Sequence, residues 1–170
     1  MRILNFFILS FVVFTLNGCD SYQQTCIKEF DPKKIKKLEI KKEPIHRYGS
    51  KSYKLYGDKF KVRKKRNHFH QRGYASWYLG NSKNSITAIN EKYDMYAMTA
   101  AHRSLPLPTY AIVTNLENNK RVIVRINDRG PFIKGRIIDL SYAAAHKLGM
   151  VKKGLVMVQI DTIDHYKNLG

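Results

Sequence analysis

The chain has 170 residues, 44% of them hydrophobic, which is enough for one domain with its own core and a tether but excludes an array of large domains. Lys and Arg number 31 against 13 Asp and Glu, so the formal net charge is +18. This balance argues against a cationic partner and favours nucleic acid, an acidic membrane surface or a polymer that carries carboxylates.

The first nineteen residues predict export. A positive start (Met1-Arg2) precedes an apolar run over residues 3–16, which is short for a bilayer span but suits a signal peptide. LNGC (residues 16–19) resembles a bacterial lipoprotein processing site, so we predict that residues 1–18 are removed and that Cys19 carries acyl chains such as palmitate. An ordinary signal peptide with an incidental cysteine is the alternative. Export argues against nucleic acid as the partner.

Residues 19–71 are predicted to be a basic tether. The run KKIKKLEIKK (residues 33–42) is dense in lysine and has too few large apolar residues for a core. A solvated spacer is the favoured interpretation, and a membrane-surface helix with Ile35, Leu38 and Ile40 on one face is the alternative. In either case anionic lipid head groups attract the run, at about 1 kcal/mol per lysine near the surface.

The cysteines and histidines predict no metal site and no cofactor. If Cys19 carries lipid, Cys26 is either a free thiol or part of an intermolecular disulfide. The six histidines are scattered, and His68 and His70 are better explained as a solvated pair than as ligands.

From residue 53 onward the pattern predicts short strands. YKLYGDKFKV (residues 53–62) alternates around Gly57-Asp58, as a short hairpin does. ENNK (residues 117–120) is a hairpin turn between two alternating runs. The strands of the globular domain are predicted at residues 73–78, 109–116, 121–127, 136–140 and 155–160.

Two helices are predicted. Ser141 is a natural N-cap, residues 142–148 contain good helix formers, and Gly149 is a natural stop. A second short helix is expected over residues 95–101. Short strands with one or two helices indicate a mainly β fold, a small closed barrel.

The stretch VIVRINDRGPFIKGRIIDL (residues 122–140) predicts a strand, a sharp turn at Gly130-Pro131 and a second strand. Asp128 lies at the lip of this turn, close to Arg125 and Arg129. An acid there most often bonds the turn backbone or a neighbouring arginine. A rigid turn is also where a scaffold presents a working group.

Four ordered blocks closely resemble the rare lipoprotein A (RlpA) family. They are GYASWY (residues 73–78) and the segments 87–116, 124–132 and 136–150. The resemblance as a whole extends beyond these blocks and covers roughly residues 53–163. It implies a six-stranded double-psi β-barrel over residues 72–163, followed by a tail over residues 164–170. We expect no C-terminal SPOR domain, which many relatives carry.

The resemblance implies lytic transglycosylation of peptidoglycan in cell wall organisation and daughter-cell separation. The bond between N-acetylmuramic acid (MurNAc) and N-acetylglucosamine (GlcNAc) is cleaved, and the muramyl C6 hydroxyl closes a 1,6-anhydro ring. One carboxylate can suffice, because the substrate supplies its own nucleophile. By resemblance, the acid/base is Asp128, and Glu91 and His102 support it.

Each supporting assignment has a structural alternative. Glu91 could be a surface acid paired with Lys92 or Arg103, and His102 a histidine at a helix end. The residues expected to contact sugar are Trp77, Tyr78, Tyr93 and Arg129. Core packing is the favoured alternative for Trp77.

Two departures from the family concern the wall of the cleft. LGNSKNSI (residues 79–86) replaces an aromatic-histidine-glycine run, and Asn90 replaces a glycine before Glu91. Asn90 can keep the turn because asparagine tolerates left-handed geometry.

Other functions stay open beside the transglycosylase. One is a non-catalytic module that binds glycan or loosens the wall, and another is a basic adaptor that recruits division-site proteins to the membrane. In each case we expect a lipid-anchored protein of the cell envelope that faces the periplasm.

Overall fold

A computed structural model describes residues 24–79 and 85–163. The chain divides into two compact units, Met1–Phe30 and Asp31–Gly170. In the first, residues 24–28 are helical, and Cys26 forms no disulfide with another described residue. The predicted signal peptide and Cys19 lie outside the described residues. No helix within the described ranges is long and apolar enough to cross a membrane.

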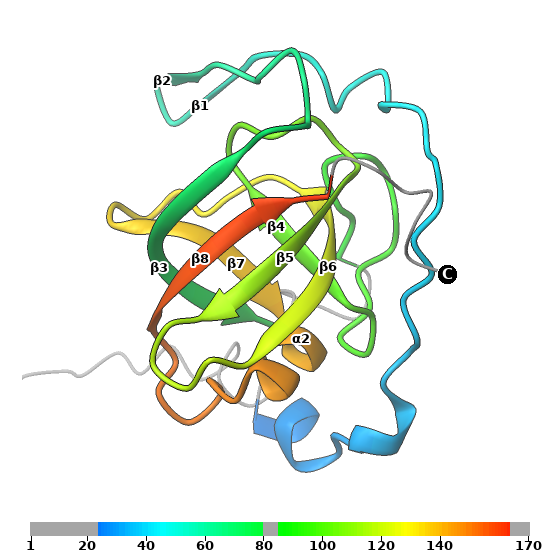
Figure 1. The fold of residues 1–170 in the computed structure, drawn as a ribbon. Coiled ribbons are helices and arrows are strands. Elements are labelled where there is room, and N and C mark those ends of the chain that lie inside the picture. Colours follow the sequence, from blue (N-terminus) through cyan, green and yellow to red (C-terminus); the bar gives the residue numbers. More distant parts are fainter. Residues whose placement is uncertain (1–23, 80–84, 164–170) are drawn as a thin grey trace, which may run out of the picture. The chain divides into compact units, whose positions relative to one another are not determined.

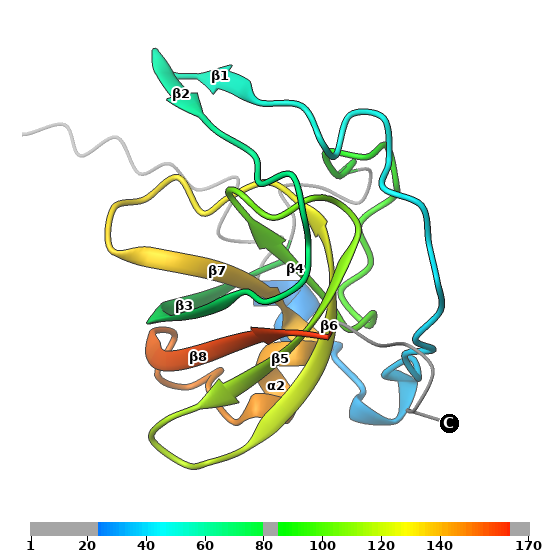
Figure 2. The same cartoon turned by 45° about the horizontal axis from the view of Figure 1, so that its top comes forward.

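The second unit is built on a closed barrel of six strands in the order β3-β7-β4-β6-β5-β8 (Figures 1 and 2). The pairs β3–β7 and β4–β6 are parallel, and the other four pairs are antiparallel. The expected mainly β fold with a six-stranded double-psi barrel is confirmed. The strands are β3 (His70–Tyr78), β4 (Thr99–His102), β5 (Thr109–Asn115), β6 (Arg121–Asp128), β7 (Arg136–Ser141) and β8 (Val156–Thr162).

Alternating apolar residues of the strands fill the barrel. Val113 of β5, Val124 and Ile126 of β6, and Ile138 and Leu140 of β7 are all fully buried. Burial of one such side chain contributes about 1.5–3 kcal/mol, so the interior supplies the rigidity that a site at the rim needs.

Helix α2 (Tyr142–Leu148) packs against β3, β6 and β7. The Ser141 hydroxyl accepts the Ala144 N–H, and Gly149 ends the helix with a left-handed φ of 71°. The predicted helix is therefore confirmed, together with both of its caps. Figures 1 and 2 show α2 at the end of the barrel opposite a two-stranded hairpin.

That hairpin consists of β1 (Tyr53–Leu55) and β2 (Asp58–Phe60). Its two turn residues are Tyr56 and Gly57, one position earlier than the Gly57-Asp58 turn expected from the alternation. Both have positive φ, 51° and 85°, as a tight two-residue turn requires.

The second helix expected over residues 95–101 does not form. The Asp94 carboxylate accepts the Tyr96 N–H at 2.9 Å and makes a turn, and β4 begins at Thr99. Strand β4 lies between β6 and β7 and pairs with both. Ladder hydrogen bonds on two sides outweigh the helix propensity of the local methionine and alanine residues.

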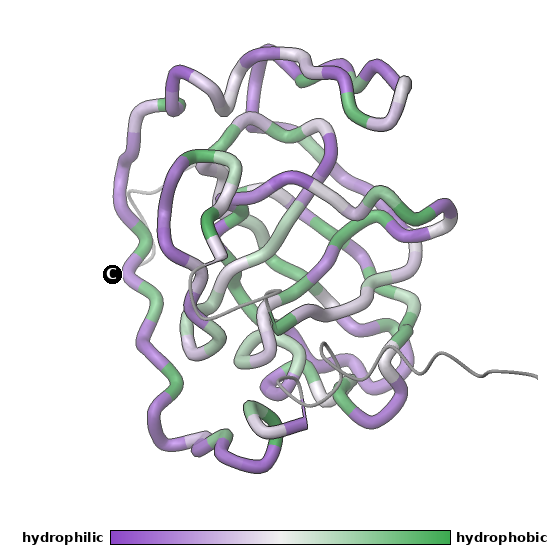
Figure 3. The backbone as a smooth tube through the Cα atoms, turned by 180° about the vertical axis from the view of Figure 1, so that it is seen from behind, coloured by the Kyte–Doolittle hydropathy of each residue, from purple (hydrophilic) through white to green (hydrophobic). Residues whose placement is uncertain are grey.

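Residues 31–52 are neither a solvated spacer nor a membrane-surface helix, so both expectations are wrong for this segment. Apart from the short helix η1 (Pro32–Lys34), residues 31–46 have no regular secondary structure. The segment runs along the barrel with hydrophilic and hydrophobic residues alternating (Figure 3). We call it the strap. Sequence composition missed it because its partners are distant in the chain.

Contacts to the barrel unit hold the strap along its length. Ile35 and Leu38 pack against the core, and the Lys36 N–H donates to the Tyr96 carbonyl at 2.9 Å. The Leu107 N–H also donates to the Gly49 carbonyl at 3.0 Å. A Cβ at Gly49 would lie 2.3 Å from the Leu107 carbonyl oxygen, so only glycine allows this close approach.

Candidate active site

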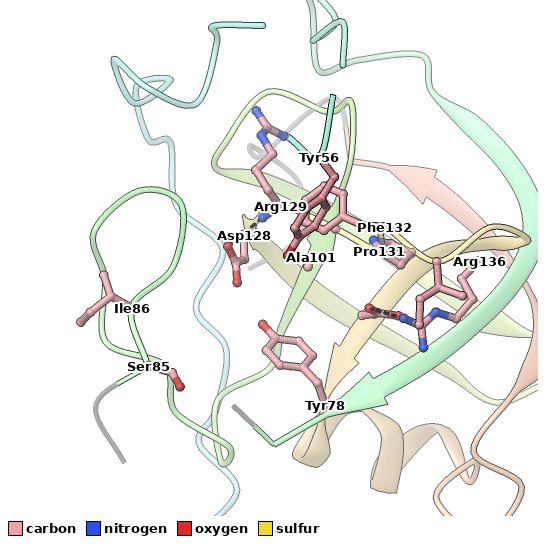
Figure 4. Close-up of a pocket in the computed structure, with 13 residues that line it drawn as sticks. Tyr56, Tyr78, Ser85, Ile86, Ala101, Asp128, Arg129, Pro131, Phe132 and Arg136 are labelled. Carbon is pink, nitrogen blue, oxygen red and sulfur yellow. Dashed lines mark hydrogen bonds and ion pairs between the residues drawn. The ribbon is translucent and has the colours of Figure 1, made fainter. Parts of the chain in front are cut away.

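Two carboxylates flank one alanine on adjacent strands. Ala101 of β4 pairs with Asp128 of β6 on one side and with Asp139 of β7 on the other. Paired residues point to the same face of a sheet, and two strand spacings place their Cα atoms about 10 Å apart. Both carboxylates line one groove of about 670 Å³, which we call the Asp128 groove (Figure 4).

Asp128 is fixed by backbone donors. Its Oδ1 accepts the Ala88 N–H at 2.8 Å and its neighbour Arg129 N–H at 2.7 Å. Among the described residues nothing bonds Oδ2, and the carboxylate faces the groove. Burial raises the pKa of Asp128 above its usual value, although these two N–H groups and the Arg129 charge oppose the rise. A carboxyl with one free oxygen and a raised pKa is suited to giving and taking a proton.

Tyr78 faces the same groove. Its hydroxyl is buried and has no hydrogen-bond partner within the described part of the chain. Burial and the nearby Asp128 charge raise its pKa well above the usual value, so it is a neutral donor. In Figure 4 this hydroxyl points into the space beside Asp128. Its donor is therefore unpaired within the described residues, at the edge of the groove.

Tyr93 supports Tyr78 from behind. The two rings lie 4.8 Å apart, and the Tyr93 hydroxyl donates to the Tyr78 carbonyl at 2.7 Å. Tyr93 does not line the Asp128 groove. Its ring packs against Tyr78 and lines a different hollow.

The Glu91 carboxylate lies outside the groove. It accepts hydrogen bonds from Arg125 at 2.7 and 2.9 Å and from Asn127 at 2.8 Å. Asn127 and Asp128 are consecutive in β6, but Asn127 lines a different hollow from Asp128. Burial raises the pKa of Glu91, but its bonds to Arg125 and Asn127 outweigh burial and hold it below its usual value. The alternative pairing with Lys92 or Arg103 is wrong, since the partner is Arg125.

Glu91 still reaches Asp128 through a turn. Thr87 and Glu91 close the turn with a backbone bond of 2.8 Å and a bond from the Glu91 N–H to the Thr87 hydroxyl at 3.1 Å. Asn90 has a left-handed φ of 64°, as expected. The turn presents the Ala88 N–H to Asp128. Glu91 thus belongs to the turn that presents a donor to Asp128.

His102 is buried, with 3% of its surface exposed, and does not line the groove. Its Nδ1 accepts the N–H groups of Ser104 and Leu105 at 3.2 and 3.1 Å, so the proton lies on Nε2 and is donated to Gln71 Oε1 at 3.2 Å. Burial and the charges of nearby arginines lower its pKa to about 3. The side chain is a neutral brace for the loop that follows β4.

Arg129 lines the groove and also joins three segments. Its guanidinium donates to the carbonyls of His102 at 3.1 Å, Leu105 at 2.6 Å and Gly49 at 2.7 Å. It also lies over the ring of Tyr53, 5.5 Å from the centroid. These bonds tie the strap to the barrel directly beside Asp128.

Trp77 packs in the barrel wall. Its indole meets the edge of Tyr142 at 5.1 Å and lies against the core. It does not line the Asp128 groove, so the geometry favours the packing alternative.

Sequence reasoning missed three groove residues. Asp139 lines the groove, and burial raises its pKa against the opposing charges of Arg136 and Arg103. Tyr56 and Phe132 supply aromatic surface. An acid flanked by apolar residues in RIIDLS was the available signal for Asp139. Residues 80–84 of the altered 79–86 segment lie outside the described ranges.

A metal site would need a set of ligand side chains among the described residues. Within residues 24–79 and 85–163, no cluster of three or more His, Cys, Asp or Glu side chains could hold an ion.

The domain is therefore a double-psi β-barrel that carries two carboxylates at the rim of a groove. Residues 70–160 match the family model described as "Lytic transglycolase". Among solved structures, Streptomyces papain inhibitor aligns with 58% of this chain and 97% of its own, with a TM-score of 0.47 and 19% identity.

Two curated relatives are both named "Endolytic peptidoglycan transglycosylase RlpA". The Vibrio cholerae protein is 50% identical over 121 residues, which cover 71% of this chain and 46% of the relative. The Rickettsia bellii protein is 38% identical over 164 residues, 91% of this chain and 70% of the relative. The chain therefore belongs to the RlpA family. It spans about half the length of the first curated relatives it matches.

Proposed function

We propose that this chain is a lytic transglycosylase that cleaves the MurNAc–GlcNAc bond of peptidoglycan and leaves 1,6-anhydro-MurNAc ends. The observation that carries the proposal is Asp128, which has a raised pKa and an Oδ2 that faces the groove and bonds none of the described residues. The printed names of the relatives support the same reaction.

Asp128 alone can perform both proton transfers. Its carboxyl first protonates the GlcNAc O4 as the bond from MurNAc C1 to that oxygen breaks. The carboxylate then takes the proton of the muramyl C6 hydroxyl as O6 bonds to C1. The proton is returned and no water is consumed, so a single acid suffices where hydrolysis needs two.

The other groove residues act on the substrate in this proposal. The Tyr78 hydroxyl donates to a sugar oxygen, which gives its buried donor a partner. The Asp139 carboxylate, across Ala101, stabilises the positive charge that develops at C1. Glu91 holds the turn that bonds Asp128, and His102 holds the loop that follows β4. Arg129 bonds the same loop and also lines the groove.

The test is product analysis with the full chain and purified glycan strands. We expect anhydro-muramyl products from the wild type, and a loss of about 10²- to 10⁴-fold in Asp128→Asn with an unchanged circular dichroism spectrum. Asp161→Asn, an acid of β8 outside the groove, is the matched control and should keep the wild-type rate. Absence of anhydro products from the folded wild type would overturn the proposal.

A second function is favoured by one observation: Glu91 and His102 do not meet Asp128 in the groove. On this alternative the chain binds glycan without cleaving it. Glycan strands would then retain the wild-type chain, and no anhydro ends would form.

The setting of the activity is also a proposal. We infer an envelope protein held by lipid at Cys19 that faces the periplasm, with the basic run at residues 33–42 drawn to anionic lipid and with division-site proteins as partners. The exposed lysines of the strap support the electrostatic part. Salt-sensitive binding of the full chain to anionic vesicles, lost when those lysines are replaced by glutamine, tests it.

A further inference from the structure

Tyr56 lies at the tip of the β1–β2 hairpin and lines the Asp128 groove. Its side chain is 89% exposed, the most exposed of the large hydrophobic residues in the described part of the chain. It therefore contributes almost nothing to the core, and its packing inside the protein does not explain an aromatic ring at this position.

The backbone at Tyr56 is strained. Both turn residues have positive φ, and the turn type favours asparagine followed by glycine. A bulky side chain in the left-handed region is an outlier and is destabilising. Strain that no packing offsets is a feature of functional sites.

The hairpin that carries Tyr56 is well supported. Tyr53 stacks on Phe60 at 5.0 Å, and Phe60 meets the edge of Phe132 at 5.4 Å. The Tyr53 hydroxyl donates to the Arg103 carbonyl at 3.1 Å. These contacts join the hairpin to the barrel loops, so the tip is held at the groove.

The groove continues past Asp128 along the hairpin. A second hollow of about 520 Å³ is lined by Tyr53 and Leu55 of β1. It shares Asp128, Arg129 and Phe132 with the first. Together the two hollows provide room for more than one sugar ring, and the hairpin forms part of their wall.

We propose that Tyr56 and Phe132 form a sugar subsite, in which the Tyr56 ring stacks on the face of a pyranose next to the bond that Asp128 cleaves. A hexosamine in a β-1,4 glycan presents C–H groups on one face and polar groups at its edge. An exposed aromatic ring matches that face, while Asp128 and Asp139 accept from hydroxyl groups at the edge. This inference rests on the proposed function, since the occupant is the glycan strand.

The decisive variant is Tyr56→Asn. Asparagine suits the left-handed turn, so we expect the variant to be as stable as the wild type or more so. Binding of purified glycan strands, measured in an Asp128→Asn background that prevents turnover, should weaken about five- to tenfold. In the active chain we expect KM to rise and kcat to stay within about twofold.

Two further variants separate the ring from general surface effects. Tyr56→Phe keeps the ring and should bind as the parent does. Leu155→Ala removes an exposed apolar side chain that lines neither hollow and should also leave binding unchanged. If Tyr56→Asn, stably folded, binds strands as tightly as Leu155→Ala, the subsite is refuted.

The outcome is distinguishable from failure of the proposed function. If the wild type releases no anhydro products while binding still depends on Tyr56, the reaction is refuted and the subsite stands. If products form and Tyr56→Asn changes neither Kd nor KM, the subsite alone is refuted.

Discussion

At the scale of single residues, Asp128 is held between opposing influences on its pKa. Burial favours the protonated form, whereas two backbone N–H groups and the Arg129 charge favour the carboxylate. Both backbone donors among the described residues approach Oδ1, so Oδ2 faces the groove. An acid/base catalyst needs this balance because it must be protonated in one step and ionised in the next.

Tyr78→Phe is expected to lower activity without lowering stability. Its buried hydroxyl has no partner in residues 24–79 and 85–163, so its removal relieves a desolvation cost. Because the hydroxyl is proposed to donate to a sugar oxygen, the rate at which anhydro products form should fall by about a hundredfold. Urea unfolding of the same variant measures its stability.

Tyr93→Phe is the matched control for that prediction. It removes the 2.7 Å bond to the Tyr78 carbonyl and should cost about 1 kcal/mol of unfolding free energy. An unchanged rate in folded Tyr78→Phe would contradict the role given to this hydroxyl.

The sequence carries a local signal for the position of Asp128. RIIDLS marks Asp139 as an acid among apolar residues, but nothing local places it beside Asp128. The turn at Gly130-Pro131 is a local signal that places Asp128 at an edge. The pairing of Ala101 with both acids involves three strands that are far apart in the chain. Asp128, Ala101 and Asp139 become neighbours only when β4, β6 and β7 pair in the closed barrel.

At the scale of elements, the strap is fastened by one arginine shared between two acids. Arg125 bonds Glu43 at 2.8 and 2.7 Å and Glu91 at 2.7 and 2.9 Å. The Tyr110 hydroxyl also donates to Glu43. This network connects the strap with the turn that holds Asp128.

Glu43→Gln is therefore expected to destabilise the protein and loosen the strap. The side chains of Glu43 and Arg125 are only 17% and 16% exposed, so loss of the charge should cost about 1–3 kcal/mol. Amide exchange at Lys36 and His46, whose N–H groups bond Tyr96 and Leu107, should accelerate.

The matched control is Glu39→Gln on the same strap. Glu39 is exposed, and loss of its charge should leave both stability and exchange unchanged. Equal effects of the two variants would show that the Arg125 network does not hold the strap.

Elements with local signals were predicted, and elements fixed by distant partners were not. Helix α2 has both of its caps in the sequence, and β6 alternates at period two. The strap depends on Arg125 and Leu107, more than 50 residues away, and β4 on its two flanking strands. The composition of a segment alone does not reveal contacts with residues that are distant in the chain.

At the scale of the whole molecule, neutral His102 makes stability depend on pH. Its pKa is about 3 in the fold and 6.5 when free, so below pH 6.5 the unfolded chain binds a proton that the folded chain excludes. Its contribution is complete above 6.5 and is lost as pH falls toward 3. Glu43 and Glu91, with lowered pKa values, add a loss below about pH 4.5, while Asp128 and Asp139, with raised values, oppose it.

His102→Asn isolates this effect. The asparagine oxygen can accept the loop N–H groups and does not titrate. The stability difference between wild type and variant should shrink by about 1.4 kcal/mol per pH unit from pH 6 to pH 4, measured by urea unfolding. A difference that is constant with pH would mean that His102 is protonated in the fold.

The attached strap also shortens the chain between the barrel and the proposed lipid. Twelve residues separate residue 19 from residue 31, a span of at most roughly 40 Å. A leash that stayed free up to residue 71 would span up to roughly 180 Å. Under the proposed lipid attachment and function, the shorter span would confine the barrel to glycan that lies close to the membrane that holds the lipid.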